Sequence, residues 1–232
     1  MPEPDESLMT ALADFAAGAG HEINNPLAII SGHAQILLEK AQTPEQRRRL
    51  AAIIAQTKRA YEMIADIRLF ACPPEPHRTY FNIFSFFDEL VAGYASPNSE
   101  FPIPIRIKRA GDSDGTANVF CDRQILRMVF DALLQNAFEA AKNKTPLVEI
   151  TPSFHPEESC WQILVTDNGP GIGAEERERV FFPYYSGRDA GRGLGFGLPR
   201  SWALMKKMGG KLALEERGFL VTLPPAEAAR TS

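Results

Sequence analysis

The sequence contains few cysteines, and they are not arranged to bind a metal. Only three are present, Cys72, Cys121 and Cys160, and none of their spacings matches a cysteine-based metal site. A small secreted domain held together by disulfides would be denser in cysteine and would carry an even number of them. The odd count and wide spacing therefore favour reduced thiols in a cytosolic protein.

The sequence also lacks a long apolar run and an excess of basic residues. No segment approaches the roughly 20 apolar residues that a membrane-spanning helix needs. The first segment, MPEPDESLMTALADF, is acidic and lacks the positive charge of a signal peptide. A formal net charge of −4 gives no general support for binding nucleic acid or an anionic membrane, and without a long apolar run we expect no direct insertion into a membrane. We therefore expect a cytoplasmic protein, whose 232 residues suffice for one large or two small domains.

Two helices are predicted in the first third of the chain. Apolar residues recur at helical spacing over residues 7–40, and Pro26 within this pattern is expected to bend the helix just after His21. Thr43 followed by a proline is typical of a helix start, and a second helix is predicted to reach about residue 70. One hairpin of this kind cannot bury both of its apolar stripes well. We therefore expect two copies to form a homodimeric four-helix bundle.

A proline-rich linker separates this helical region from the rest of the chain. Residues 1–72 are predicted to form the helical domain, 73–77 the linker and 78–225 a second domain. In the second domain a strong helix is predicted over residues 124–142, among several short segments with the alternation typical of strands. Strands and helices mixed in this way predict an α/β sandwich. The chain as a whole is therefore assigned to the α+β class.

The first predicted helix contains a histidine followed by an acid, in the segment HEINNPL that begins at His21. A neutral imidazole is a good phosphoryl acceptor, and the adjacent Glu22 can take the proton that leaves it. Asn25 lies four residues on and hence on the same helix face, where its amide could direct a water at a phosphohistidine. Taken alone, the segment also fits an ordinary helical histidine beside a solvated glutamate. The remaining histidines are expected to be structural or solvated: His33, His77 and His155.

Two downstream segments have features of a nucleotide pocket. Asn136 in LLQNAFEAA offers a single amide oxygen, which suits a phosphate-bound Mg²⁺ that keeps several waters. Asp167 in DNGPGIG follows an apolar strand and can accept a hydrogen bond from an adenine amino group. Gly169 and Gly171 permit a tight turn close to the base. A solvated asparagine and a plain Asp-Asn-Gly turn are the alternatives when each segment is taken alone.

A third segment, GRGLGFGL, places glycines at every second position before a predicted helix: Gly191, Gly193, Gly195 and Gly197. Such a loop frees backbone N–H groups to bind phosphates at a helix N-terminus, and Arg188 and Arg192 could add positive charge. The segment does not match the eight-residue P-loop pattern, because no Gly-Lys-Ser/Thr follows the glycines. By itself, a glycine-rich loop is weak support for a nucleotide site.

Taken in order, these motifs resemble the catalytic core of bacterial two-component sensor histidine kinases, over residues 7–223. HEINNPL is similar to the H-box of that family, in its nitrogen-regulator form, and LLQNAFEAA to the N-box. DNGPGIG, FFPYYSGR and GRGLGFGL are similar to the G1-, F- and G2-boxes. The resemblance implies a helical dimerisation and phosphotransfer domain. It also implies an ATP-binding domain of the kind shared with gyrase, heat-shock chaperone and mismatch-repair ATPases.

The resemblance further implies a function and a role for each candidate residue. The function is a protein histidine kinase, which transfers phosphate from Mg²⁺-ATP to its own histidine and then to an aspartate of a response regulator. His21 would be the acceptor and Glu22 its acid/base, and Asn25 would support phosphatase action on the partner. Asn136 would bind Mg²⁺ and Asp167 adenine. Five glycines would shape the nucleotide site. Gly169 and Gly171 would shape the base pocket, and the phosphate lid would be shaped by Gly193, Gly195 and Gly197. The input would come from a separate or removed sensor module.

The chain departs from the family pattern in three places. Ala132 stands where many relatives carry a second asparagine, Arg192 stands where threonine or serine is usual, and the segment between Phe182 and Gly191 is short. Two other functions stay open. A scaffold or phosphotransfer dimer would bind ATP without forming phosphohistidine, and a related ATPase would turn over ATP whether or not His21 is present.

Overall fold

The chain folds into two compact units, Met1–Pro73 and Pro74–Ser232. The structure is a computed structural model that describes residues 6–95, 103–108, 117–141, 145–177, 179–183, 185 and 195–225. Within these ranges no helix is both long enough and apolar enough to cross a membrane.

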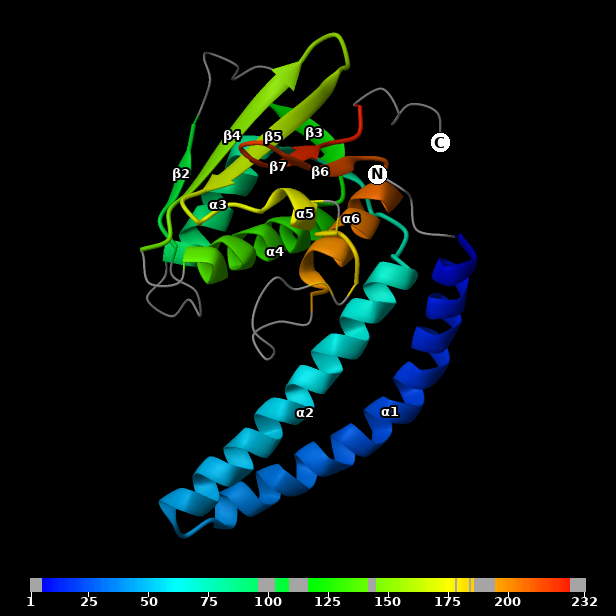
Figure 1. Ribbon diagram of the computed structural model, residues 1–232, viewed down its shortest axis with the longest axis vertical. Helices are drawn as coiled ribbons and strands as arrows, with labels where there is room; N and C mark the ends of the chain where they lie inside the picture. The colour runs from blue at the N-terminus through cyan, green and yellow to red at the C-terminus, as the bar shows by residue number, and fades with distance from the viewer. Residues whose placement is uncertain are drawn as a thin grey trace. The chain divides into compact units, whose positions relative to one another are not determined.

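The first unit is a hairpin of two long helices, α1 (Glu6–Lys40) and α2 (Pro44–Ala71). Thr43 caps α2: its side chain accepts a hydrogen bond from the backbone N–H of Gln46, while the Gln46 side chain accepts one from the backbone of Thr43. This reciprocal capping fixes the helix start that the sequence predicts. α1 continues through Pro26 without a break, and in Figure 1 it is bowed whereas α2 is nearly straight.

The two helices meet along a seam in which residues recur at alternating intervals of three and four, the spacing of antiparallel helices that pack closely. On α1 the less exposed positions are Gly20, Asn24, Leu27, Ser31, Ala34 and Leu38, and on α2 they are Leu50, Ile54, Thr57, Tyr61 and Ile64. Large apolar side chains remain exposed outside the seam: Ile23, Ile29, Ile30, Ile36, Leu37 and Ile53. One hairpin therefore buries only part of its apolar surface.

The second unit contains a two-stranded and a five-stranded sheet. The small sheet pairs β1 (Thr79–Asn82) with β3 (Asn118–Cys121) in antiparallel fashion. The large sheet has the order β2 (Ile105–Ile107), β4 (Val148–His155), β5 (Cys160–Asp167), β7 (Gly218–Thr222) and β6 (Lys211–Glu215). β2 and β4 run parallel, and the other neighbours are antiparallel.

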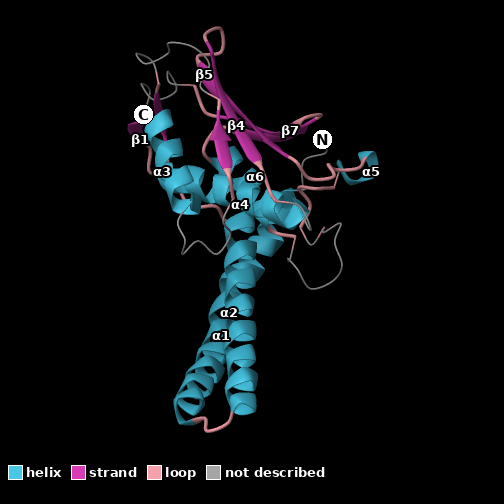
Figure 2. Ribbon diagram, turned by 90° about the vertical axis from the view of Figure 1, so that its left-hand side faces the viewer, coloured by secondary structure: helices cyan, strands magenta, loops and turns pink. Residues whose placement is uncertain are grey.

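Three helices cover one face of the large sheet: α3 (Ile83–Ala95), α4 (Arg123–Ala141) and α6 (Gly197–Lys207). Figure 2 shows them gathered on one side of the strands, and the short helix α5 (Ala174–Arg177) lies apart from them. Alternate residues of β4, β5 and β7 are buried beneath these helices, as expected when one face of a sheet is covered. The predicted α+β class, with a helical hairpin followed by an α/β sandwich, is confirmed.

Candidate functional site

The predicted phosphoacceptor segment lies within α1. His21 occupies a helical backbone position, and its side chain lies outside the part of the structure that is described. Glu22 and Asn25 are both exposed on this helix. Because α1 is helical on both sides of His21, Asn25 lies one turn further along the same face. The helix therefore presents an acid and an amide to solvent beside the histidine position.

The Asp167 turn follows directly from the end of β5, the central strand of the large sheet. Asp167 is the last residue of β5, and its exposed carboxylate accepts a hydrogen bond from the backbone N–H of Gly169 at 2.7 Å. A Cβ atom on Gly169 would lie 2.6 Å from that carboxylate oxygen and 3.0 Å from the Cβ of Ala140. Only glycine fits this close approach of the turn to α4. Gly171, the next glycine of the turn, has a φ of +78°.

α4 carries Asn136 on the face that meets both glycine segments. Asn136 is half-buried, and Ala132 and Ala140 lie one turn before and one turn after it. Ala140 faces the Gly169 turn, and the Cβ of Ala132 would be 3.8 Å from a Cβ on Gly197, the first residue of α6. Segments that are far apart in the sequence therefore converge around the side chain predicted to bind Mg²⁺. Ala132 is buried at the contact between α4 and α6.

The glycine-rich segment is described only in part. Gly195 has a φ of +68°, and a Cβ there would lie 2.5 Å from the carbonyl oxygen of Tyr185, so this close approach also requires glycine. Arg188 and Gly193 lie outside the described residues, as do Gly191 and Arg192.

Asn168 is a contributor to the site that the sequence analysis missed. Its side-chain oxygen accepts the N–H of Leu147 at 3.0 Å, and its side-chain amide donates to the carbonyl of Thr145 at 3.0 Å. Its backbone N–H also donates to the carbonyl of Leu147 at 3.2 Å. Asn168 therefore fastens the segment that precedes β4 to the Asp167 turn. Asparagine is common in turns because its side chain forms hydrogen bonds with the nearby backbone. Its presence in this turn therefore did not indicate hydrogen-bond partners some twenty residues away.

Asp122 is a second residue that the sequence analysis missed. One carboxylate oxygen caps α4 by accepting the N–H groups of Gln124 and Ile125, at 2.8 and 3.0 Å. The other accepts the backbone N–H of His77 at 2.7 Å. Asp122 thus joins the end of the predicted linker to the helix that carries Asn136. An acid before a helix signals a cap, but nothing in the sequence links it to His77.

The residues present fit a nucleotide with a magnesium ion. The exposed carboxylate of Asp167 is held in place by its hydrogen bond with the N–H of Gly169. It is suited to accept a further hydrogen bond from the amino group of a base. The amide of Asn136 supplies the single oxygen that suits Mg²⁺ held mainly by phosphates and water. Among the described residues, no cluster of three or more histidine, cysteine or acidic side chains is placed to hold a metal ion.

Comparisons with known proteins match both units. Residues 11–75 match the His Kinase A (phospho-acceptor) domain. Residues 121–227 match the histidine kinase-, DNA gyrase B- and HSP90-like ATPase family. Sporulation kinase C of Bacillus subtilis is 27% identical over 223 residues, which cover 93% of this chain and 50% of that protein. The sensory histidine kinase/phosphatase NtrB of Rhodobacter capsulatus is 30% identical over 189 residues, covering 77% of this chain and 52% of that protein. The chain spans about half the length of these two curated relatives.

Solved structures show the same fold. Full-length ShkA in complex with AMPPNP aligns with a TM-score of 0.72 at 24% identity, over 92% of this chain and 46% of that chain. The histidine kinase ThkA in complex with the response regulator protein TrrA aligns with a TM-score of 0.65 at 22% identity, over 97% of this chain and 65% of that chain. With both domain families present in the order of the motifs, the chain belongs to the sensor histidine kinases and comprises their catalytic core, a phosphoacceptor domain followed by an ATPase domain.

Proposed function

We propose that this chain is a protein histidine kinase, which phosphorylates its own His21 from ATP and passes the phosphoryl group to an aspartate of a separate response-regulator receiver. The observation that supports this best is the convergence on one face of α4, where Asn136 lies between contacts to the Gly169 turn and to the start of α6. The match to a phosphoacceptor domain over residues 11–75 supplies the other half of the argument.

His21 is the nucleophile in this proposal. A nitrogen of its neutral imidazole attacks the γ-phosphorus of ATP, the bond from that phosphorus to the bridging oxygen breaks, and ADP leaves. Glu22 takes the proton that the imidazole loses. Most of the acceleration comes from positioning and from neutralising charge on the phosphates. In the proposed phosphatase reaction, Asn25 directs a water molecule at the phosphoryl group of the partner.

The ATP-binding unit holds the nucleotide through residues in named roles. Asp167 accepts a hydrogen bond from the adenine amino group, and Gly169 and Gly171 shape the turn beside the base. Asn136 ligates Mg²⁺, which neutralises phosphate charge when bound. The backbone of the glycine-rich segment lines the phosphates through Gly193, Gly195 and Gly197, and Arg188 adds positive charge.

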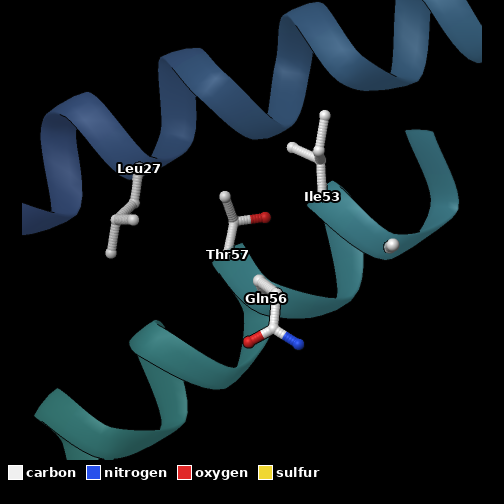
Figure 3. Close-up of a pocket in the computed structure, with 5 residues that line it drawn as sticks. Leu27, Ile53, Gln56 and Thr57 are labelled. Carbon is white, nitrogen blue, oxygen red and sulfur yellow. The ribbon is translucent and has the colours of Figure 1, made fainter. Parts of the chain in front are cut away.

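A homodimer is part of the proposal, and the exposed apolar surface of the hairpin supports it. A groove between α1 and α2 is lined by Leu27, Ala52, Ile53, Gln56 and Thr57. In Figure 3, Leu27 extends from α1 towards α2, and Ile53 and Thr57 extend from α2 towards α1. A second hairpin would cover this groove and the exposed isoleucines, as in a four-helix bundle.

The remaining partners follow from the proposed reaction. The same proposal assigns phosphotransfer to residues 1–72 and ATP binding to residues 78–225, with a linker at residues 73–77. It also includes a cytoplasmic location, because the reaction consumes ATP and needs a receiver domain within reach. A separate or removed sensor module would supply the signal.

Incubation with γ-labelled ATP and Mg²⁺ tests this function, and the chain offers a matched control. The wild type and His33→Gln, which changes an exposed histidine on the same helix, should gain label that is lost in acid and kept in alkali. His21→Gln should gain none. Binding of ATP without label in any protein would favour the scaffold, and ATP turnover that survives His21→Gln would favour the ATPase.

A further inference from the structure

We propose that Tyr61 is a positioning residue: its hydroxyl holds the turn of α1 that follows the phosphoacceptor, and thereby sets the orientation of His21 for phosphoryl transfer. The proposal rests on the proposed autokinase function. It assigns a role to a residue of α2 that none of the sequence motifs contains.

The geometry that carries the proposal is a hydrogen bond between the two helices. The Tyr61 hydroxyl donates to the backbone carbonyl oxygen of Asn24 at 2.8 Å, across 37 residues of sequence. Tyr61 is half-buried on the seam of the hairpin, and Asn24 lies opposite it. Asn24 is three residues after His21, so the bond fastens the turn that follows the acceptor.

This turn of α1 has fewer backbone hydrogen bonds than the rest of the helix, so a hydrogen bond from α2 can stabilise it. Pro26 has no N–H, so the carbonyl of Glu22 loses its usual donor within the helix. The proline ring also crowds the preceding turn, which makes this stretch easier to bend than the rest of the helix. A donor from α2 that engages the carbonyl of Asn24 fixes how far this segment bends.

Side-chain packing supplies little restraint at the same level of the seam. Gly20, one turn before Asn24, has no side chain, and a Cβ there would meet only the Cγ2 of Ile64, at 3.5 Å. The side-chain oxygen of Asn24 is buried and accepts no hydrogen bond from the described residues. A glycine and an incompletely satisfied asparagine contribute less than a pair of interlocking apolar residues. The Tyr61 hydroxyl therefore forms its hydrogen bond at the level of the seam where side-chain packing is weakest.

The consequence for the reaction is a change in rate without a change in ATP affinity. Phosphoryl transfer needs the imidazole in line with the γ-phosphorus, and small misplacements of reacting groups are costly. If the turn is more mobile, the His21 side chain samples more orientations. A smaller fraction of these orientations is then in line with the γ-phosphorus. The nucleotide residues belong to the other compact unit, so the KM for ATP is expected to stay unchanged.

Tyr61→Phe removes the hydroxyl and leaves the ring in place. The matched control is Thr57→Val, because Thr57 is a buried seam residue one turn away whose hydroxyl donates to the carbonyl of Ile54 within α2. Both variants delete one hydroxyl from the same face of the same helix, but only the Tyr61 hydroxyl reaches α1. In the full chain we would measure kcat and KM for phosphohistidine formation, together with hydrogen exchange of the amides of residues 22–28.

Tyr61→Phe is expected to lower kcat by about tenfold at constant KM and to speed amide exchange over residues 22–28, while Thr57→Val leaves both near wild type. Equal kcat and exchange in Tyr61→Phe and wild type would overturn the proposal. So would parallel losses in both variants, which indicate general destabilisation of the hairpin. If the wild type itself forms no phosphohistidine, the autokinase function fails. The exchange data, which need no ATP, then still report whether Tyr61 holds the turn.

Discussion

Asp167 carries recognition of the base in this account, and its carboxylate serves two purposes. One oxygen accepts the N–H of Gly169 at 2.7 Å and shapes the turn, and the exposed carboxylate is proposed to accept a hydrogen bond from the adenine amino group. Asp167→Asn retains an oxygen for the turn but brings an N–H₂ group against a base that itself donates. ATP affinity is expected to fall by at least about tenfold, or about 1.4 kcal/mol, when measured by calorimetry.

Glu216→Gln is the control for Asp167→Asn, because it also removes one exposed carboxylate from the same unit but lies beyond the end of β6. It should bind ATP as the wild type does. Unchanged affinity in Asp167→Asn would show that the base is recognised elsewhere.

The cysteines differ in environment, and this predicts their reactivity. Burial raises the pKa of Cys121 to about 12, with the neighbouring Asp122 adding to the effect and Arg78 opposing it. Burial also raises the pKa of Cys160, and the hydrogen bond to Glu158 adds to it. Cys72 is exposed. Because the thiolate is the reactive form, iodoacetamide should modify Cys72 in the native protein well before the other two.

Mass spectrometry of the alkylated protein checks this order, and rapid labelling of Cys121 before unfolding would contradict the burial described. The pKa of Cys121 in the folded state lies above its ordinary value of 9.0. The protonated Cys121 thiol therefore contributes fully to the free energy of unfolding below about pH 9. This contribution is lost as the pH rises towards 12.

Candidate site residues could be assigned from the sequence where the chemistry is local, and their roles stay predictions. Asp167, Asn136 and their glycines are recognisable because the motifs place unusual residue types next to each other. Asn168 and Tyr61 were not assigned their roles, because each acts through a partner at least twenty residues away. An asparagine in a turn and a tyrosine in an apolar stripe each have a simpler local interpretation.

Asp122 links two elements, the linker and α4. Its carboxylate accepts three backbone N–H groups, from His77, Gln124 and Ile125. Asp122→Ala leaves these donors without that acceptor, so the free energy of unfolding of the ATP-binding unit is expected to fall by about 2 kcal/mol. Denaturant titration followed by circular dichroism measures the change.

Asp122→Asn keeps one oxygen acceptor and should lose clearly less stability than the alanine variant. Equal losses in the two variants would mean that the packing of the side chain, and not its hydrogen bonds, supports the helix start.

The limits of the three helices predicted from the sequence agree closely with the structure, because the signals that define them are local. Thr43 and Pro44 define the start of α2, and the apolar periodicity defines α4 to within a residue or two. The pairing of β1 with β3 and the parallel contact of β2 with β4 were not predicted. Those pairings join strands that are separated by helices, and short apolar strands of similar composition do not specify their partners.

At the scale of the whole molecule, the exposed apolar face of the hairpin predicts a dimer. Ile30 is 47% exposed on α1, and a charge there would have to be buried in a four-helix bundle. Ile30→Glu is therefore expected to shift the protein from dimer to monomer in sedimentation equilibrium. Tyr80→Glu, a charge at a side chain that is 65% exposed on the other unit, should leave the dimer intact. A wild type that is monomeric at micromolar concentration would refute the bundle.

The site of phosphorylation tests the central claim most directly. The full chain would be incubated with ATP and Mg²⁺, digested at alkaline pH, and its peptides mapped by mass spectrometry. The account predicts a phosphoryl group on His21 and on no other residue. Phosphate on His33, His77 or His155, on a hydroxyl side chain, or on no residue despite bound ATP, would contradict it.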